Sequence, residues 1–349
     1  MRLSDFDFDY PETAVASEPA APRDSARLLV ARRGPGGPRR EHRVFRDLPG
    51  LLEPGDCLVL NRTKVFPARL LGRKATGGKA DLLLVRELEP GLWAALSSGL
   101  KPGMRLEFAS GLSAAVESLD DEGQYVCRFC RTAILGFLQE HGLTPLPPYI
   151  RKARRSRGAA ADGTAAGDGD RYQTVYARHQ GSIAAPTAGL HFTEAVFSAL
   201  KDRGVSTAWV TLHVGRGTFR PVEHDDPRQH RMLPEWYRVE AEDAAAVARA
   251  RGEGRRVVAV GTTSTRTLET LAAGPGFSSA AEGWTDLFIL PGHEFRAVGG
   301  LVTNFHLPRS TPILLAGAFL GREPLLEAYR EAVSMGYRLF SFGDAMLIL

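Results

Sequence analysis

Four stretches of the sequence combine small residues with histidine, arginine or hydroxyl side chains, and each begins near the end of an apolar, strand-like segment. Ligands of α/β sheets bind beyond the carboxyl ends of strands. We therefore predict that the four stretches build one polar site. They are "APTAGLHFT" (185–193), "TLHVGRGTFRPV" (211–222), "GTTSTRTLE" (261–269) and "TNFHLPRST" (303–311).

Two histidines in these stretches, His191 and His213, are the candidate acid/base groups. An imidazole titrates near pH 6.5 and can either give or take a proton. Strand alternation places His213 on the same face as Thr211 and opposite Leu212, away from the aliphatic side. The alternative is a hydrogen-bonded histidine in the core.

The third stretch resembles a strand that turns through glycine into a helix. Backbone N–H groups at such a helix start can hold a carboxylate or a phosphate, with Arg266 alongside. N-capping by Thr263 or Ser264 is the alternative. The GxxxxGK[ST] pattern of a nucleotide-binding loop is missing from the sequence.

Two classes of function fit these residues. One is a transferase that holds a polar organic substrate. The other is a metal-dependent hydrolase with histidine ligands, but the HxH and HExxH spacings of zinc sites do not occur. We favour the transferase and expect no metal. The histidines available to the hydrolase are His191, His213, His230 and His306.

The three cysteines predict no disulfide framework. Cys127 and Cys130 form a CxxC pair, and Cys57 stands alone. Residues three apart on a strand face opposite sides, so we expect a structural role for the pair.

The chain has 349 residues, a net charge of +4 and a pI of about 9.0, which permits a nucleic-acid partner. Basic residues cluster at 31–43 and at 151–157, either as solvated loops or as contacts to a polyanion. The sequence shows no apolar leader and no run of about 18 apolar residues. We expect a cytoplasmic protein without a membrane segment.

Alternating helical and strand patterns dominate the sequence after residue 150. The predicted strands include 205–214, 255–261, 285–291 and 337–349. Short strands separated by Gly, Pro and Asp turns fill 71–145, which is typical of a small β-barrel. We predict an α/β fold in which a smaller, barrel-like all-β domain is inserted into a larger α/β domain. The expected boundaries are 1–70, 71–149 and 150–349, and the low-complexity segment 158–170 is expected to be a mobile loop.

Long motifs along the chain are similar to those of the QueA family of S-adenosylmethionine:tRNA ribosyltransferase-isomerases. The resemblance covers nearly the whole chain and includes the four stretches above. The other motifs are "NRTKVFPARLLGRK" (61–74), "PLPPYI" (145–150), "RYQTVYA" (171–177), "GWTDLFILPG" (283–292) and the terminal "YRLFSFGDAMLI" (337–348).

This resemblance implies a transferase of queuosine biosynthesis that consumes S-adenosylmethionine as a ribosyl donor. The ribosyl portion moves to the aminomethyl group of a 7-deazaguanine in the tRNA anticodon. The product is epoxyqueuosine, and adenine and methionine leave. The family pairs an α/β domain with a β-barrel and uses neither a metal nor a cofactor. We expect a monomer.

In that reaction His191 and His213 are the residues expected to move protons, because a base must remove a C5′ proton and adenine leaves more easily when it is protonated. Asn304 and His306 are expected to form hydrogen bonds with the edge of the adenine or the 7-deazaguanine base. Hydroxyls and guanidinium groups are expected to bind ribose or the methionyl carboxylate. The complete set of candidate substrate-binding residues is Thr187, Arg216, Thr262, Thr263, Ser264, Arg266, Asn304 and His306.

Contacts with tRNA phosphates are expected from lysine and arginine side chains. The first choice is Arg151, Lys152, Arg154, Arg155 and Arg157, and the second is Arg62, Lys64 and Arg69.

Some positions depart from the family pattern. Arg62 follows Asn61 where a second asparagine is common, and Lys64 replaces an arginine. Leu233 and Pro234 stand where His-Ser is expected, and Ser17 replaces a glutamine. Glu235 and Trp236 are expected to keep a structural role. A catalytically inactive tRNA-binding protein therefore stays open as a further alternative.

Overall fold

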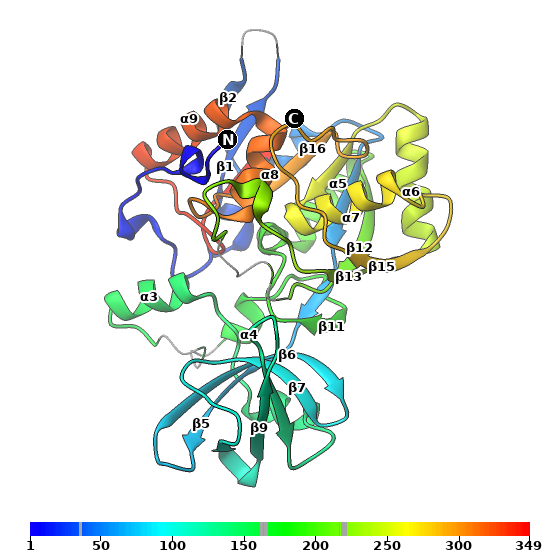
Figure 1. Cartoon of the computed structure of the whole chain (residues 1–349). Coiled ribbons are helices and arrows are strands. Elements are labelled where there is room, and N and C mark those ends of the chain that lie inside the picture. Colours follow the sequence, from blue (N-terminus) through cyan, green and yellow to red (C-terminus); the bar gives the residue numbers. More distant parts are fainter. Residues whose placement is uncertain (35–36, 161–162, 164–166, 216, 218–221) are drawn as a thin grey trace.

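A mixed sheet forms the centre of the larger domain (Figure 1). The computed structural model describes residues 1–34, 37–160, 163, 167–215, 217 and 222–349, and within them this sheet has nine strands. Four neighbouring strands, β12, β3, β14 and β16, are parallel, so their carboxyl ends meet at one edge. In order across the sheet the strands are β15 (Ala281–Thr285), β13 (Glu235–Val239), β12 (Ser206–Leu212), β3 (Cys57–Asn61), β14 (Val257–Val260), β16 (Gly300–Asn304), β17 (Ala345–Ile348), β1 (Arg27–Arg32) and β2 (Arg39–Val44).

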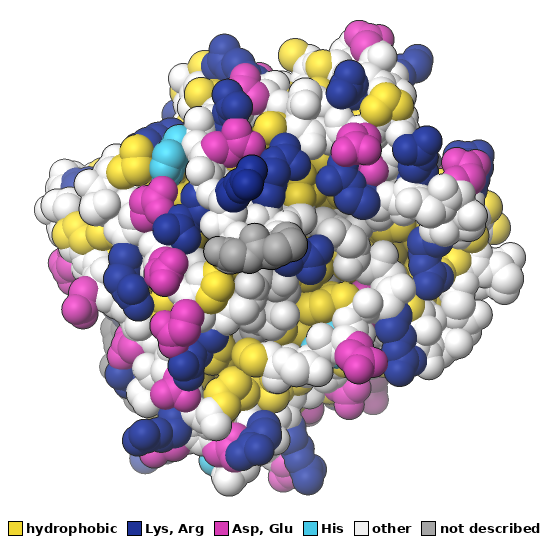
Figure 2. All heavy atoms as spheres, turned by 90° about the horizontal axis from the view of Figure 1, so that it is seen from above, with side chains coloured by type: hydrophobic (Ala, Val, Ile, Leu, Met, Phe, Trp, Pro, Cys, Tyr) yellow, Lys and Arg dark blue, Asp and Glu magenta, His cyan; other side chains and the backbone are white. Residues whose placement is uncertain are grey.

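The basic cluster at 31–43 lies on the β1–β2 hairpin, and several of its arginines are paired with carboxylates. Arg40 contacts Glu331 of helix α9 (Arg322–Ser334) at 2.6 Å, and Arg43 contacts Glu41 at 2.7 Å. Lys and Arg side chains are interspersed with Asp and Glu over the face shown in Figure 2. This face is therefore not a continuous basic surface.

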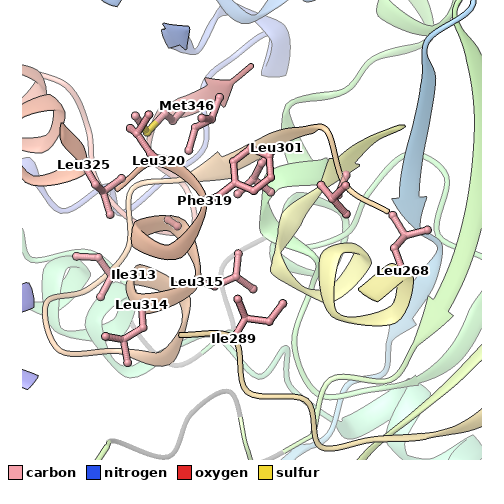
Figure 3. Packing of buried hydrophobic residues seen from close by; sticks show 14 of the residues in the cluster. Leu268, Ile289, Leu301, Ile313, Leu314, Leu315, Phe319, Leu320, Leu325 and Met346 are labelled. Atoms are coloured by element: carbon pink, nitrogen blue, oxygen red, sulfur yellow. The ribbon is translucent and has the colours of Figure 1, made fainter. Parts of the chain in front are cut away.

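Helices cover both faces of the sheet, because its buried strands are apolar on both sides. Successive residues of β1 alternate between two cores: Leu28 packs in one and Leu29 in the other. On one side, Leu315 and Phe319 of α8 pack near Leu301 of β16 (Figure 3). The helices of this domain are α1 (Leu48–Leu51), α5 (Glu194–Asp202), α6 (Ala241–Gly252), α7 (Gly261–Ala273), α8 (Thr311–Leu320) and α9 (Arg322–Ser334).

A closed antiparallel barrel forms the smaller domain, as expected from the sequence. It has its own core, which includes Leu82, Trp93 and Cys127. The boundaries 1–70, 71–149 and 150–349 remain predictions. The barrel strands are β5 (Arg69–Lys74), β6 (Lys79–Glu89), β7 (Leu92–Leu96), β8 (Arg105–Glu107), β9 (Ser113–Leu119) and β10 (Tyr125–Phe129), followed by α2 (Leu135–His141).

The CxxC pair lies at the end of β10. Cys127 is buried in the barrel core, and burial raises its pKa to about 12, whereas Cys130 is exposed. Cys127 therefore has the packing role expected of it, whereas a structural role for Cys130 stays a prediction.

Short elements connect the barrel to the large sheet (Figure 1). Strand β4 (Thr63–Val65) pairs in parallel with β11 (His179–Ser182), and α3 (Pro148–Ser156) and α4 (Asp168–Arg171) lie nearby. Residues 161–162 and 164–166 of the predicted mobile loop lie outside the described residues.

Among the helices described, none is long and apolar enough to cross a membrane. The 3-10 helices are η1 (Leu3–Phe6), η2 (Glu12–Ala14), η3 (Arg23–Ser25), η4 (Phe45–Asp47), η5 (Ala109–Gly111), η6 (Thr187–His191) and η8 (Pro227–Gln229).

Two predicted strands are wrong over most of their length. In 285–291 only Thr285 is in a strand, because the Arg266 guanidinium binds the carbonyls of Thr285 and Leu287 in place of a neighbouring strand. In 337–349 only Ala345–Ile348 is a strand, because the Asp344 carboxylate accepts from the backbone N–H of Arg338 and turns the chain. Both deviations come from side chains that compete for backbone groups.

Candidate functional site

A cavity of about 610 Å³ lies beyond the carboxyl ends of β14 and β16. We call it the sheet-edge cavity. The segment 184–188, the start of α7, the loop 303–312 and the start of α3 contribute to its wall. Five predicted substrate-binding residues line it: Thr187, Thr262, Thr263, Asn304 and His306.

Asn304 lies in this wall in a fixed orientation. Its Oδ1 accepts a hydrogen bond of 2.8 Å from Thr187 Oγ1, and its Nδ2 donates to Nε2 of His191 over 3.4 Å. His191 does not line the cavity; it is 4% exposed, and burial lowers its pKa to about 4. A neutral imidazole accepts from the amide, so His191 orients Asn304 from behind.

His306 is the histidine that lines the sheet-edge cavity. Its Nε2 lies 2.6 Å from Thr303 Oγ1, and its backbone N–H donates to the Tyr329 hydroxyl. Burial lowers its pKa to about 3, so the ring is neutral near pH 7. A neutral imidazole can donate to or accept from a ligand here, depending on its tautomer.

Helix α7 begins directly at the end of β14. Gly261 adopts φ +84°, a conformation that allows the abrupt change from strand to helix. The N-cap is Val260, without a side-chain cap, so capping by Thr263 or Ser264 is wrong. Thr263 Oγ1 instead accepts from Asn61 at 3.2 Å. Among the described residues no side chain caps the first turn of α7, so its N–H groups are available to a ligand at this wall of the cavity.

Two other predicted contacts do not reach the cavity. Ser264 is fully buried and is not part of the cavity wall. Arg266 is buried against Glu235 and two backbone carbonyls, so its guanidinium is already occupied. Arg216 lies outside the described residues.

Lys152 and Arg309 are the cationic side chains among the described residues that line the sheet-edge cavity. Lys152 pairs with Glu12 at 2.5 Å, and Arg309 pairs with Asp7. The sequence predicts Lys152 to be a tRNA contact and predicts no role for Arg309. The signal for Arg309 was its position in the stretch 303–311.

Asn61 has a further role at the edge of the sheet that the four stretches do not predict. Its side chain binds the backbone of Leu212 through both its oxygen and its nitrogen and donates to Thr263. It therefore ties together the carboxyl ends of β3 and β12 and the start of α7. The available signal was a buried amide at the end of an apolar strand.

A second cavity, of about 700 Å³, lies between the barrel and the large sheet. We call it the interdomain cavity. Glu87, Trp93 and Glu122 line it from the barrel side. Residues of the sheet side include His213, Val214, Leu233, Glu235, Trp236 and Trp284.

His213 is held from three directions in the wall of this cavity. Its ring stacks on Trp236, with centroids 4.9 Å apart and planes inclined by 23°. Its Nδ1 lies 2.8 Å from Thr63 Oγ1. A Cβ at Gly181 would lie 2.6 Å from Nε2, so only glycine fits against the ring. Burial, with a smaller effect from His179, lowers its pKa to about 4.

Since His213 lies in the interdomain cavity and His191 behind the sheet-edge cavity, the two predicted acid/base histidines do not form a pair. The remaining candidate ligand of the hydrolase alternative, His230, packs on Phe288. In the described parts of the chain, no group of three His, Cys, Asp or Glu side chains could hold a metal ion. The hydrolase alternative is therefore not favoured.

Glu235 and Trp236 have the structural roles expected of them. Glu235 accepts from the backbone of Gly215 at 3.0 Å and pairs with Arg266, which fixes the turn after β12. Trp236 donates to Glu282 at 3.1 Å while it supports His213.

Several arginines predicted to contact tRNA are buried in ion pairs. Arg154 is 0% exposed and lies 2.8 Å from Asp168. Arg62 and Arg69 are buried beside Asp243 and Asp81, at 3.4 and 2.6 Å. These three guanidinium groups are not accessible to phosphates, which corrects their assignment.

The other predicted tRNA contacts differ in exposure. Arg157 donates to Ser17 Oγ and to the carbonyls of Thr13 and Val15, so it holds the N-terminal segment. Arg151 is half-buried. Lys64, Lys152 and Arg155 are exposed.

Comparisons with known proteins agree with this architecture. A family model described as "Queuosine biosynthesis protein" matches residues 3–348. The chain is similar to proteins named S-adenosylmethionine:tRNA ribosyltransferase-isomerase from Anaeromyxobacter sp. (strain Fw109-5), at 53% identity over 100% of this chain and 99% of the relative, and from Symbiobacterium thermophilum, at 49% over 100% of both. It is also similar to the crystal structure of S-adenosylmethionine tRNA ribosyltransferase from Thermotoga maritima, with a TM-score of 0.56 and 38% identity over 99% of this chain and 100% of that one.

Proposed function

Because the chain belongs to the queuosine biosynthesis protein family, we propose that it is an S-adenosylmethionine:tRNA ribosyltransferase-isomerase. The observation that carries this proposal is the 53% and 49% identity to relatives of that name over essentially their full length. The ribosyl portion of S-adenosylmethionine is transferred to the aminomethyl nitrogen of a 7-deazaguanine in the tRNA anticodon. It is isomerised to give epoxyqueuosine, and adenine and methionine are released.

The sheet-edge cavity is our choice for S-adenosylmethionine. Thr187, Thr262 and Asn304 present hydroxyl and amide groups of the kind that bind ribose and adenine. The uncapped start of α7 and the cations Lys152 and Arg309 suit the methionyl carboxylate. These two cations replace Arg266 in our assignment, and the role expected of Arg216 stays a prediction.

Two neutral histidines are available for proton transfer. His306 lines the sheet-edge cavity and can hydrogen-bond a nitrogen of the leaving adenine. His213 lines the neighbouring cavity, where it can take a proton from the attacking amine. His191 acts only through Asn304 and is a positioning residue.

S-adenosylmethionine is a consumed substrate in this proposal, so no separate cofactor is needed. We expect the protein to work as a monomer in the cytoplasm, with tRNA as its macromolecular partner.

The test is a direct assay with S-adenosylmethionine and tRNA that carries 7-aminomethyl-7-deazaguanine. Adenine release is followed together with the mass of the modified nucleoside. Adenine release with a ribosyl-sized mass gain supports the proposal, and tRNA with guanine at that position is the control. A methyl-sized gain would mean a methyltransferase. tRNA binding without a product would favour the inactive tRNA-binding protein. Leu233→His and Pro234→Ser, in the wall of the interdomain cavity, would then be the first substitutions to test for restored activity.

A further inference from the structure

Trp93 carries a buried hydrogen-bond donor that the fold leaves unused. Its side chain is 4% exposed and packs in the barrel core, yet it also contributes to the wall of the interdomain cavity. Its indole Nε1 has no hydrogen-bond partner among the described residues. A buried N–H without an acceptor is destabilising, so a side chain that carries one and contributes to a cavity wall points to an acceptor supplied by a ligand.

We propose that the interdomain cavity binds the 7-deazaguanine base of the tRNA, flipped out of the anticodon loop, with Trp93 donating to its carbonyl oxygen. This inference rests on the proposed function and assigns its two substrates to separate cavities. A base that undergoes chemistry has to leave its stack, which requires least energy in a single-stranded loop.

An aromatic surface for the flipped base lies opposite the barrel. Trp236 and Trp284 are direct cross-strand partners on β13 and β15, so their side chains lie on the same face. Trp236 is held by His213 and Glu282, whereas Trp284 is 57% exposed. An exposed indole at the rim of a cavity is typical of surfaces on which unpaired bases stack.

The charges around the cavity fit a base that carries a cationic aminomethyl group. Glu87 and Glu122 line the barrel side. Each already accepts one hydrogen bond, from Gly91 N–H and from Gln124 Nε2, which restrains its carboxylate. Arg86, exposed beside Glu87 on the same strand, also lines the cavity and is suited to the phosphate of the nucleotide whose base enters it.

The two cavities are neighbours, as the reaction requires. Val214 lines both, beside His213 at the end of β12. An amine held in the interdomain cavity can therefore approach a ribosyl group held in the sheet-edge cavity across Val214. Small residues accompany Val214 in both walls: Ala184 in one and Gly215 in the other.

The experiment compares two anticodon stem-loop RNAs, one with 7-aminomethyl-7-deazaguanine and one with an abasic nucleotide at that position. Dissociation constants are measured without S-adenosylmethionine. We expect the wild-type protein to bind the base-bearing loop about tenfold more tightly, in line with stacking on aromatic side chains. Trp284→Ala and Trp93→Phe should each reduce this ratio at least threefold, whereas Leu71→Ala, an exposed apolar residue on the barrel, should leave it unchanged.

Thermal melting of each variant separates a loss of base recognition from a loss of folding. Trp284→Ala should affect folding less than Trp93→Phe, because Trp284 is exposed. A ratio near one in the wild type, or an unchanged ratio in the folded variants, would overturn the inference. Adenine release by the wild-type protein tests the proposed function separately. If the protein distinguishes the two RNAs through Trp93 and Trp284 but releases no adenine, the proposed base-binding site is supported and the proposed reaction is refuted.

Discussion

The Asn304 amide lies between two groups that fix it, with Thr187 Oγ1 at 2.8 Å from its oxygen and His191 Nε2 at 3.4 Å from its nitrogen. The histidine is buried and the asparagine lines the sheet-edge cavity. Since the imidazole is neutral, its Nε2 can accept a hydrogen bond, which directs the Nδ2 end of the Asn304 amide toward His191 and the Oδ1 end toward Thr187. The recognition chemistry of the cavity thus depends on a residue outside its wall.

His191→Leu should raise KM for S-adenosylmethionine about tenfold and change kcat little, because the amide loses its orientation and about one hydrogen bond. His191→Gln can still accept from Asn304 and should restore most of the affinity. Steady-state kinetics on both variants check this. A drop in kcat of about 100-fold with unchanged KM in both variants would instead give His191 a direct part in the chemistry.

His213→Ala should lower kcat about 100-fold or more, the usual scale for loss of a general acid or base. Gly181→Ala should also lower kcat, because the new Cβ would lie 2.6 Å from the His213 ring and displace it. Gly50→Ala is the matched control, since open space surrounds a Cβ there. Rates of adenine release decide the outcome. Near-normal turnover of His213→Ala would remove this histidine from the mechanism.

Stability should fall as the pH is lowered below about 6.5, partly because of His191. Its folded pKa, about 4, is below the ordinary value of about 6.5, so between these values the unfolded chain binds a proton that the folded protein does not. The contribution of neutral His191 to the free energy of unfolding is fully present above pH 6.5. It decreases as the pH is lowered toward 4, by at most about 1.4 kcal/mol per pH unit. Urea unfolding at several pH values should give a shallower slope for His191→Gln. An identical slope would mean that His191 is protonated in the folded protein.

Removal of an exposed basic side chain of α3 should weaken tRNA binding, whereas removal of the buried Arg154 should destabilise the fold. Arg155→Ala on α3, combined with Lys64→Ala on β4, should weaken tRNA binding and lower the slope of log Kd against log salt by between one and two, because both side chains are exposed. Arg154→Ala should instead destabilise the fold by about 3–5 kcal/mol, because it leaves Asp168 buried without its cation.

Binding titrations at several salt concentrations and urea unfolding separate these two effects. An unchanged salt slope in the double variant would place the tRNA on another surface. A fully stable Arg154→Ala would show that Asp168 is neutral or has found another partner.

Local sequence alone predicts loops that form the wall of the sheet-edge cavity. Apolar segments that end near Gly261 and Asn304 predict buried strands followed by polar loops, and the parallel pairing of β14 and β16 brings these loops together. The barrel was predictable for a similar reason, because alternation and turn residues are local signals.

Which charged residues are accessible depends on contacts between distant parts of the chain. Arg62, Arg154 and Arg266 are in basic or polar stretches, yet each meets a carboxylate brought in from elsewhere in the chain. Burial of a guanidinium depends on such long-range pairing, which no local pattern reveals. The same holds for the separation of His191 from His213 and for the unpaired donor of Trp93, since both depend on how the barrel and the sheet pack around a shared space.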